Sequence, residues 1–403
     1  MIEFLQEKLA TQFWFSVVWM LVVMLVILTS VAACILAERK IAAFIQDRKG
    51  PNRVGPWGLF QPIADGLKFF LKEDITPANV DRPIFFLATA MSFIIAMLGF
   101  AIIPWGGDLH LPWMAEGATV STQVASLNVG ILYILAVGSL SVYGIVLAGW
   151  ASNNKYAFYG GMRATAQMLS YEVPLGLGVL CLLLTTGDLR LETMVAQQAS
   201  SGVWNIFLHP IAFMLILISA FAETNRAPFD LAEAEQELVG GFHVEYSSMK
   251  FALFFLAEYA HMITSSALMV AMFFGGWHLW GVTDPASTSI VAVLLKLAVF
   301  AVKVMLFIVF FMVIRWTVPR FRFDQLMQLA WRGLVPIGLG MVVLTSLLAA
   351  VGWQRSFPAC LLVNAVMLAV VVWLAARSKA PITGRQANMP KIDVIPTGGV
   401  PTS

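Results

Sequence analysis

The chain has 403 residues, of which 59% are hydrophobic and only 12% carry a charge. Its mean hydropathy of +0.82 excludes an ordinary soluble domain of this length. The formal net charge is +2, and we expect no nucleic-acid partner. Composition therefore predicts an all-α, polytopic integral membrane protein.

Nine apolar runs are long enough to cross the hydrocarbon layer of a bilayer, which is about 30 Å thick. In chain order they cover residues 14–36, 84–105, 125–150, 164–186, 204–222, 249–275, 290–314, 333–353 and 357–375. We expect about nine transmembrane helices in a single membrane domain over residues 1–377. A polar cytoplasmic tail is expected over residues 378–403.

The basic residues predict the orientation of these helices. Most of the 25 Lys and Arg fall between alternate pairs of spans or in the tail, in 38–82, 151–163, 225–250, 315–332 and 377–403. The opposite side has only Lys8, Arg190 and Arg355. Because cytoplasmic loops retain basic residues, we expect the N-terminus outside and the C-terminus in the cytoplasm of a bacterial inner membrane. The first run lacks a small-residue cleavage pattern, so we interpret it as a retained helix.

The first predicted cytoplasmic segment combines a folded loop with an amphipathic helix. Two Gly-Pro steps, at Gly50-Pro51 and Gly55-Pro56, break helix and fix turns. Between Trp57 and Lys72, apolar residues then recur at helical spacing, which is typical of a helix in the membrane interface. The alternative is that this helix is a simple surface anchor.

Six carboxylates lie between Ala222 and Tyr246 with a single arginine, Arg226. They are Glu223, Asp230, Glu233, Glu235, Glu237 and Glu245. Unpaired acids near a low-dielectric medium are expected to titrate at raised, coupled pKa values, which favours proton handling. An alternative is a solvated helix with Asp230 as N-cap and Glu233 completing a capping box.

Three further ionisable residues lie inside apolar runs: Glu172, Glu258 and Lys303. An ionised group there is costly without a partner, so such residues are functional candidates. The competing interpretation is a structural ion pair that only holds helices together.

Ligand sets for redox cofactors are missing from the sequence. Cys34, Cys181 and Cys360 are isolated in apolar runs, without the spacing of a zinc site or an iron–sulfur cluster. There is also no glycine-rich phosphate loop. We expect no metal site, and any redox centre should belong to a partner protein.

Four sequence blocks together resemble one known family. They are Glu38-Arg39-Lys40 with the Gly-Pro loop and Gln61-Pro62-Ile63-Ala64-Asp65, Gly161-Met162-Arg163 with Ser170-Tyr171-Glu172, Ala222 to Leu231, and Arg320 to Met327. These blocks look like the signatures of the H-type membrane subunit of proton-pumping NADH:quinone oxidoreductase, respiratory complex I, which is the counterpart of mitochondrial NADH dehydrogenase subunit 1. The resemblance covers about residues 14–350, so the ninth predicted span and the tail lie beyond it.

The resemblance implies a quinone-access tunnel and a buried path that couples quinone reduction to proton translocation. Residues implied near the tunnel or its junction with partner subunits are Arg39, Lys40, Arg48, Arg53, Asp65, Arg226, Arg320 and Arg322. Phe229 and the amphipathic helix, with Phe60, Ile63 and Leu67, are implied to face the isoprenoid tail. The implied coupling acids are Glu172, Glu223, Asp230, Glu233, Glu235, Glu237 and Glu258, with Lys303 a further intramembrane candidate.

The same resemblance implies partners and cofactors. Quinone would be the substrate, with its headgroup ligands on a partner subunit. FMN and iron–sulfur clusters are expected on the subunits of the hydrophilic arm, and this chain is expected to bind none. Small membrane subunits and antiporter-like pumping subunits would complete the membrane arm.

Two alternatives remain open at this point. A secondary transporter or ion channel would also carry intramembrane Glu and Lys, but the halves of the chain show no internal repeat. The membrane subunit of an energy-converting hydrogenase shares several of the acids and has no quinone to bind. The complete Gly-Pro loop and the Ala-Glu-Thr-Asn-Arg block favour the quinone enzyme.

Overall fold

The computed structural model describes residues 2–112, 118–231 and 235–377. Within these residues the chain is almost wholly helical, and the only strands are two short ones. β1 (Asp108–Leu109) pairs antiparallel with β2 (Val120–Ser121). The predicted all-α class is confirmed.

Helices occupy all nine predicted apolar runs. They are α1 (Ile2–Ile45), α3 (Arg82–Leu98), α4 (Gly130–Ala151), α5 (Lys155–Thr186), α8 (Pro210–Glu223), α10 (Ser248–Phe273), α11 (Ile290–Thr317), α13 (Val335–Val351) and α14 (Phe357–Arg377). Among the described residues, 7 helices are long and apolar enough to cross a membrane. The other two, α8 and the apolar part of α14, are shorter.

The fifth predicted span is interrupted by a proline. A short helix, α7 (Asn205–Leu208), ends one residue before α8 begins at Pro210. Proline has no backbone N–H and is favoured in the first turn of a helix, where that donor has no partner in any case. The run 204–222 therefore folds as two helices with a break at His209.

The remaining helices lie between the spans. They are α2 (Gln61–Leu71), α6 (Leu191–Ser201), α9 (Glu235–Leu238) and α12 (Phe323–Gln328), with 3₁₀ turns Pro56–Gly58 (η1), Gly99–Ile102 (η2) and Gly241–His243 (η3) and a π-helical turn Leu329–Leu334 (η4). The predicted amphipathic helix is confirmed as α2. Leu231, which would be the first residue of a helix capped by Asp230, is not helical, and Glu233 of the alternative capping box lies outside the described residues.

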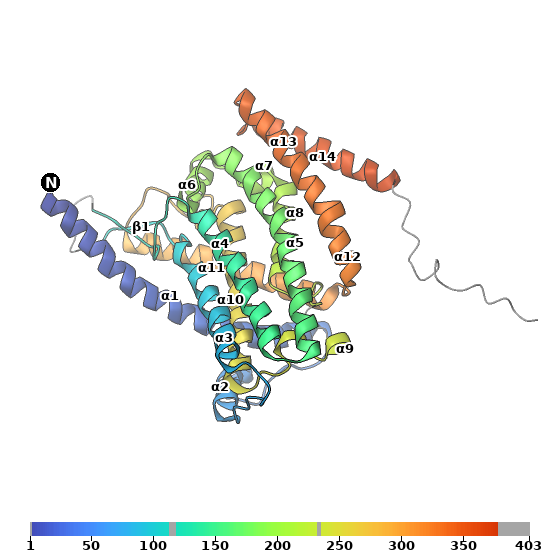
Figure 1. The fold of residues 1–403 in the computed structure, drawn as a ribbon. Coiled ribbons are helices and arrows are strands. Elements are labelled where there is room, and N and C mark those ends of the chain that lie inside the picture. Colours follow the sequence, from blue (N-terminus) through green and yellow to red (C-terminus); the bar gives the residue numbers. More distant parts are fainter. Residues whose placement is uncertain (1, 113–117, 232–234, 378–403) are drawn as a thin grey trace, which may run out of the picture.

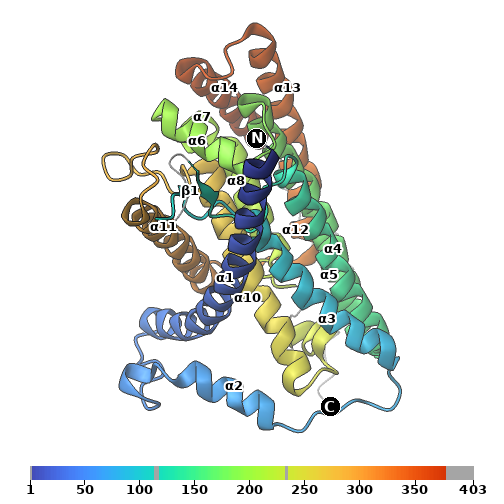
Figure 2. The same cartoon turned by 90° about the vertical axis from the view of Figure 1, so that its left-hand side faces the viewer.

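The spans form a bundle with two outlying helices. α4 packs between α3 and α5, and α5 also packs against α8 and α13. In Figure 1, α11 crosses behind the bundle at a steep angle and α1 extends away from it toward the N-terminus. Figure 2 shows α2 lying across the end of the bundle opposite to α6 and α7. The bundle therefore has one end with α2 and α9, and another with α6 and α7.

Glycines allow close approach where α5 passes its neighbours. A Cβ on Gly160 would come within 2.6 Å of the backbone of Gly241, and one on Gly149 within 2.8 Å of the carbonyl oxygen of Ala157. Backbone atoms cannot yield as the end of a flexible side chain can. The α5 backbone thus fixes the position of the loop that follows α9.

We predict that Gly160→Ala destabilises the chain while Gly176→Ala does not. Overpacking of this kind costs about 1–3 kcal/mol, whereas a Cβ on Gly176, in the same helix, meets nothing within 4 Å. Thermal unfolding of the two purified variants in detergent measures the difference. Equal midpoints would show that the loop moves aside to make room.

Candidate functional site

Arg226 lies in the loop after α8, and its guanidinium is buried among acids from two helices. Its Nη1 donates to Glu38 Oε2 at 2.8 Å, and its Nε lies 2.7 Å from Glu258 Oε1. The guanidinium carbon also stands 4.0 Å from the centre of the Tyr259 ring. Only 2% of the Arg226 side chain is exposed, so these groups take the place of water around the charge.

Glu38, near the end of α1, gathers a second set of partners. Tyr259 donates its hydroxyl to Glu38 Oε2 at 2.7 Å, and Arg315 of α11 is paired with Glu38 Oε1. Two arginines and a tyrosine thus surround one carboxylate. Together these contacts join α1, α10, α11 and the loop after α8.

The charge on Arg226 is stable in this setting. Burial alone would lower the pKa of its guanidinium, but the carboxylates of Glu258 and Glu38 raise that pKa by more, so it ends above its usual value. Arg226 therefore acts as a fixed positive charge between two acids. Glu258 is thus ion-paired, and its partner is Arg226 of the loop after α8.

Asp230 forms the next ion pair along the loop. Its Oδ2 lies 3.0 Å from Arg320 Nη2. Burial raises the pKa of Asp230 to about 6, although the Arg320 guanidinium lowers it. The direction of this shift is the one expected for an acid in this stretch.

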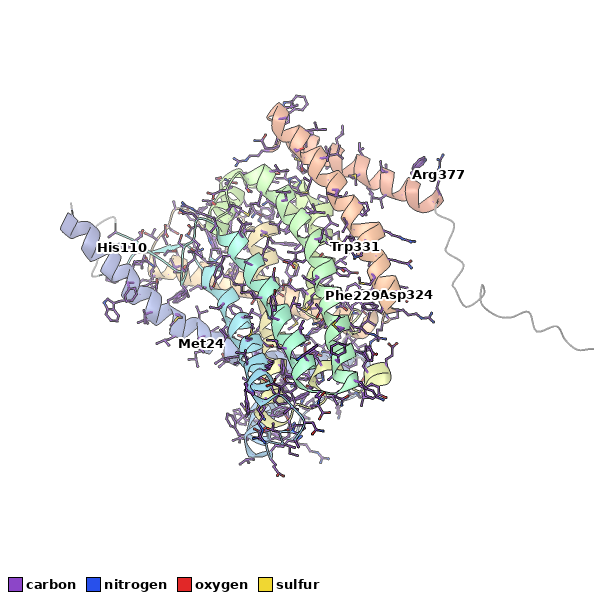
Figure 3. All side chains as sticks on the ribbon, viewed as in Figure 1. Met24, His110, Phe229, Asp324, Trp331 and Arg377 are labelled. Carbon is purple, nitrogen blue, oxygen red and sulfur yellow. The ribbon has the colours of Figure 1, made fainter. Side chains whose placement is uncertain are left out.

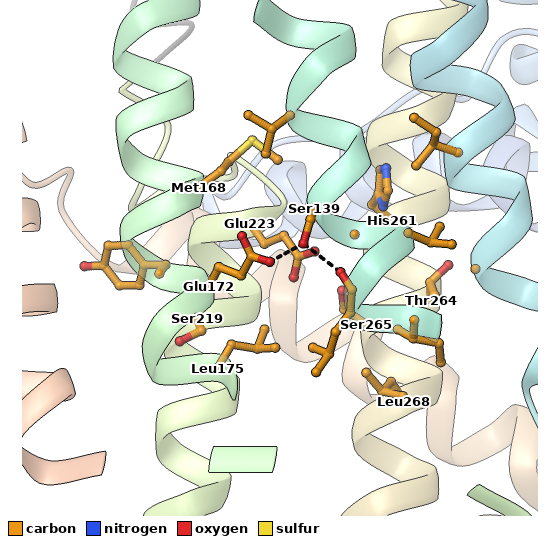
Figure 4. Close-up of a pocket in the computed structure, with 18 of the residues that line it drawn as sticks. Ser139, Met168, Glu172, Leu175, Ser219, Glu223, His261, Thr264, Ser265 and Leu268 are labelled. Carbon is orange, nitrogen blue, oxygen red and sulfur yellow. Dashed lines mark hydrogen bonds between the residues drawn. The ribbon is translucent and has the colours of Figure 1, made fainter. Parts of the chain in front are cut away.

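Glu172 and Glu223 meet inside the bundle around a closed cavity. Figure 4 shows Glu172 of α5, Glu223 of α8 and Ser139 of α4 pointing toward one another, and Ser139 donates to Glu172 Oε1. Glu223 lies so near α4 that a Cβ on Gly138 would come within 2.8 Å of its Oε1. The cavity has a volume of about 60 Å³ and is also lined by His261 of α10.

A second cavity links this acid pair to the arginine group. Its volume is about 50 Å³, and it shares Glu223, His261 and Met168 with the first cavity. Glu258, the partner of Arg226, lines its other side. The structure therefore brings Glu172, Glu223, Glu258, Arg226 and Glu38 into one continuous series.

Two predicted coupling residues lie away from this series. Glu237 forms an ion pair with Arg163 at 2.6 Å, and 57% of its side chain is exposed, so it belongs to the surface. Lys303 donates to the carbonyl oxygens of Phe274, Gly276 and His278 at distances of 2.6–3.0 Å, which uses all of its N–H groups. Both residues thus lie outside this series, and their role in coupling stays a prediction.

The acid-rich stretch is divided among several neighbours. Arg226 pairs with acids of other helices, while Asp230 and Glu237 have arginines of their own and Glu245 accepts from Asn154 Nδ2 at 2.6 Å. The idea of six acids sharing one arginine is therefore wrong. Glu233 lies outside the described residues, as does the side chain of Glu235.

The predicted tunnel residues gather at the end of the bundle that carries α2. Arg39 Nη1 contacts Asp65 Oδ2 at 2.7 Å and ties α1 to α2. Lys40 and Arg48 line an open hollow of about 410 Å³ with Lys49 and Trp57. Arg53 and Arg322 are exposed. Phe60, Ile63 and Leu67 of α2 are each more than half exposed.

Phe229 is an exception among these predicted residues. Its ring lies 5.8 Å from that of Tyr171 and 5.6 Å from that of Phe321, and 5% of the residue is exposed. Figure 3 shows it beside α5 and α12. It packs inside the bundle, and its contact with an isoprenoid tail stays a prediction.

Several residues of the site were missed from the sequence. Glu38 and Arg315 lie at the ends of apolar runs, where a charge is easily interpreted as facing water. Ser139 and His261 are single polar residues within apolar helices. Polar positions inside predicted spans are a usable signal, but their partners lie on helices far away in the chain.

Comparisons with known proteins point to one family. The NADH dehydrogenase family model matches residues 18–346. The H-type subunit of NADH-quinone oxidoreductase from Leptospira biflexa is 49% identical over 341 residues, covering 82% of this chain and 95% of the relative. The corresponding subunits from Geobacter metallireducens and Flavobacterium johnsoniae are 48% and 47% identical, over 79% and 77% of this chain and 92% and 87% of those proteins.

A family match over most of the chain and relatives this similar identify the family. With its apolar helices, the chain is a multi-pass membrane protein and a subunit of an oxidoreductase complex. It belongs to the NADH dehydrogenase family, and within it to the H-type subunits of NADH-quinone oxidoreductase.

Proposed function

We propose that this subunit lines the access path of quinone and couples quinone reduction to proton translocation through its buried acids. The observation that carries the proposal is the continuous series from Glu38 through Arg226, Glu258 and Glu223 to Glu172. It begins beside Arg39, which is tied to α2, and ends in the middle of the bundle.

Charge coupling along this series has a simple physical basis. Reduction of a quinone headgroup consumes two protons and changes the charge beside it. In a low-dielectric interior, a change at one acid alters the proton affinity of the next. Glu258 forms an ion pair with Arg226, and it lines the second cavity together with Glu223. The same acids therefore register a charge change at one end and transmit it to the other.

The α2 side supports entry of a long apolar substrate. Phe60, Ile63, Leu67 and Phe70 form an exposed apolar stripe, which an isoprenoid tail could follow from the lipid. The hollow lined by Lys40, Arg48 and Lys49 offers positive charge to a quinone-binding or iron–sulfur partner subunit. In this proposal α2 lies on the cytoplasmic side and the N-terminus lies outside. FMN and the iron–sulfur clusters are bound by partner subunits.

We predict that Glu172→Gln lowers quinone reduction and proton pumping by about tenfold or more while the complex still assembles. Glutamine keeps the shape and the hydrogen bond from Ser139 but cannot titrate. Glu172→Asp should retain part of the activity. Rates in membrane vesicles, with NADH to an artificial acceptor as reference, measure the effect.

Glu237→Gln is the matched control for Glu172→Gln, because Glu237 is also paired but lies on the surface. It should retain nearly full activity. Full activity in Glu172→Gln, or an equal loss in both variants, would remove Glu172 from the coupling path.

The pH dependence of turnover should respond to Arg320. Burial raises the pKa of Asp230 to about 6, although the Arg320 guanidinium lowers it. Removal of that positive charge in Arg320→Gln should therefore raise the pKa of Asp230 further. If turnover needs ionised Asp230, the acid limb of the rate profile moves to higher pH in Arg320→Gln, whereas Asp230→Asn, which cannot ionise, lowers turnover at every pH. Arg322→Gln, at an exposed neighbour with no ion pair among the described residues, should leave the profile unchanged. An unshifted profile in Arg320→Gln would exclude Asp230 from the rate-determining protonation.

A charge on the α2 stripe should obstruct long-tailed quinone selectively. Ile63→Arg is expected to raise the apparent KM for a long-tailed quinone by about tenfold and to affect a short-tailed analogue much less. Ile63→Leu keeps the apolar surface and is the control. An equal loss of activity with both quinones in an intact complex would show that α2 is a surface anchor. The quinone path would then have to run elsewhere.

A further inference from the structure

The last helix and the turn before it contact α8 and α5, the two helices that carry the acid pair. The family match ends at residue 346, and the segment 352–377 beyond it forms the turn after α13 and then α14. We propose that Asn364 and Arg355 of this segment are positioning residues for Glu223 and Glu172. The proposal rests on the coupling function above.

Asn364 bridges the break between α7 and α8. Its Nδ2 donates to Leu208 O at 2.9 Å, and its Oδ1 accepts from the backbone N–H of Ile211 at 3.4 Å. Pro210 has no backbone N–H, so the break lacks one hydrogen-bond donor. No side chain caps the N-terminus of α8 locally. The amide therefore supplies, from another helix, the bonds that a local cap would make.

The burial of Asn364 gives it a specific role. It is 6% exposed in a helix that is otherwise apolar, and an amide there is costly without partners. Its other bond, to Cys360 O at 2.8 Å, stays within α14. The two bonds across to residues 208 and 211 are thus the ones that join α14 to α8.

Arg355 performs the corresponding task at the end of α5. Its Nε and Nη2 donate to the carbonyl oxygens of Thr185 and Thr186 at 3.4 and 3.3 Å. These are the last residues of α5, where carbonyl groups have no partner within the helix and attract positive charge. Thr185 Oγ1 also lies 2.8 Å from His209 Nε2 at the break. The end of α5 that Arg355 contacts therefore adjoins the break that Asn364 bridges.

The helices transmit this constraint to the acids. α8 has only 14 residues between the break and Glu223, and α5 carries Glu172 toward the same cavity. α13 packs closely between α5 and α14, because a Cβ on Gly338 would come within 2.9 Å of Leu177 of α5 and one on Gly340 within 3.0 Å of Met367 of α14. A loosened break lets α8 shift along α5 and changes the separation of the two acids.

A membrane anchor is the competing role for α14. Its lipid-facing residues, such as Leu362 at 62% exposure, would serve that role, and the identity of residue 364 would then not matter. Leu362→Ala is therefore the matched control within the same helix.

The experiment compares Asn364→Leu, Asn364→Gln and Leu362→Ala in the assembled complex in membranes. Hydrogen exchange of residues 205–214 measures the break directly. Asn364→Leu should raise exchange there by about tenfold and lower kcat severalfold, with KM for quinone unchanged because α2 is at the other end. Asn364→Gln should restore part of both, and Leu362→Ala should change neither.

A double-mutant cycle with Glu223→Gln separates positioning from general destabilisation. If Asn364 acts through Glu223, Asn364→Leu adds little to the loss in kcat already caused by Glu223→Gln. Multiplied losses, or unchanged exchange in Asn364→Leu, would overturn the proposal. Full activity of Glu223→Gln alone would instead overturn the coupling function, since the exchange measurement is independent of it.

Arg355→Met keeps the test open if Asn364→Leu does not assemble. Arg355 is exposed on the turn, so its loss does not disturb the core. Exchange at residues 183–188 should rise, and kcat should fall without a change in KM. Unchanged exchange and kcat in this variant would overturn the role of the segment.

Discussion

The structure depends on one buried positive charge. Arg226 sits between Glu38 and Glu258 with almost no contact with water, so the attraction must replace a large hydration energy. Removing any one partner would leave an uncompensated charge in the bundle. Because Glu38 also holds Arg315, this requirement fixes α1 and α11 against α10. Both helices point away from the bundle along much of their length, and the contacts of Glu38 hold them to it at this point.

The same arrangement explains why acids of one sequence stretch serve different purposes. Glu223 turns inward toward Glu172, Asp230 turns to Arg320, and Glu237 reaches the surface at Arg163. Left-handed backbone at Asn225, Val239 and Gly240 turns the loop between them. The loop therefore distributes acids in space, and among the described acids of this stretch Glu223, at the end of α8, joins the buried series.

Hydropathy located the nine helices and the amphipathic α2 because burial in lipid dictates composition along each segment. Motif blocks and charges inside apolar runs predicted Glu172, Glu223, Glu258 and Arg226 as site residues, and the structure brings these side chains near one another. The sequence did not reveal partners from distant segments, such as the three carbonyls that accept from Lys303 and Glu38 as the second acid of Arg226. Such contacts depend on helix packing, which local pattern does not determine.

The small volumes of the two cavities bear on how the membrane stays insulating. At about 60 and 50 Å³, each has room for water beside the acids, since one water needs at least about 10–15 Å³ of such space. A membrane potential drives each charge with about 2.3 kcal/mol per 100 mV, so a continuous file of water beside these acids would short-circuit the gradient. Leu175, Leu268 and Met168 line the first cavity, and their apolar surfaces oppose such a file.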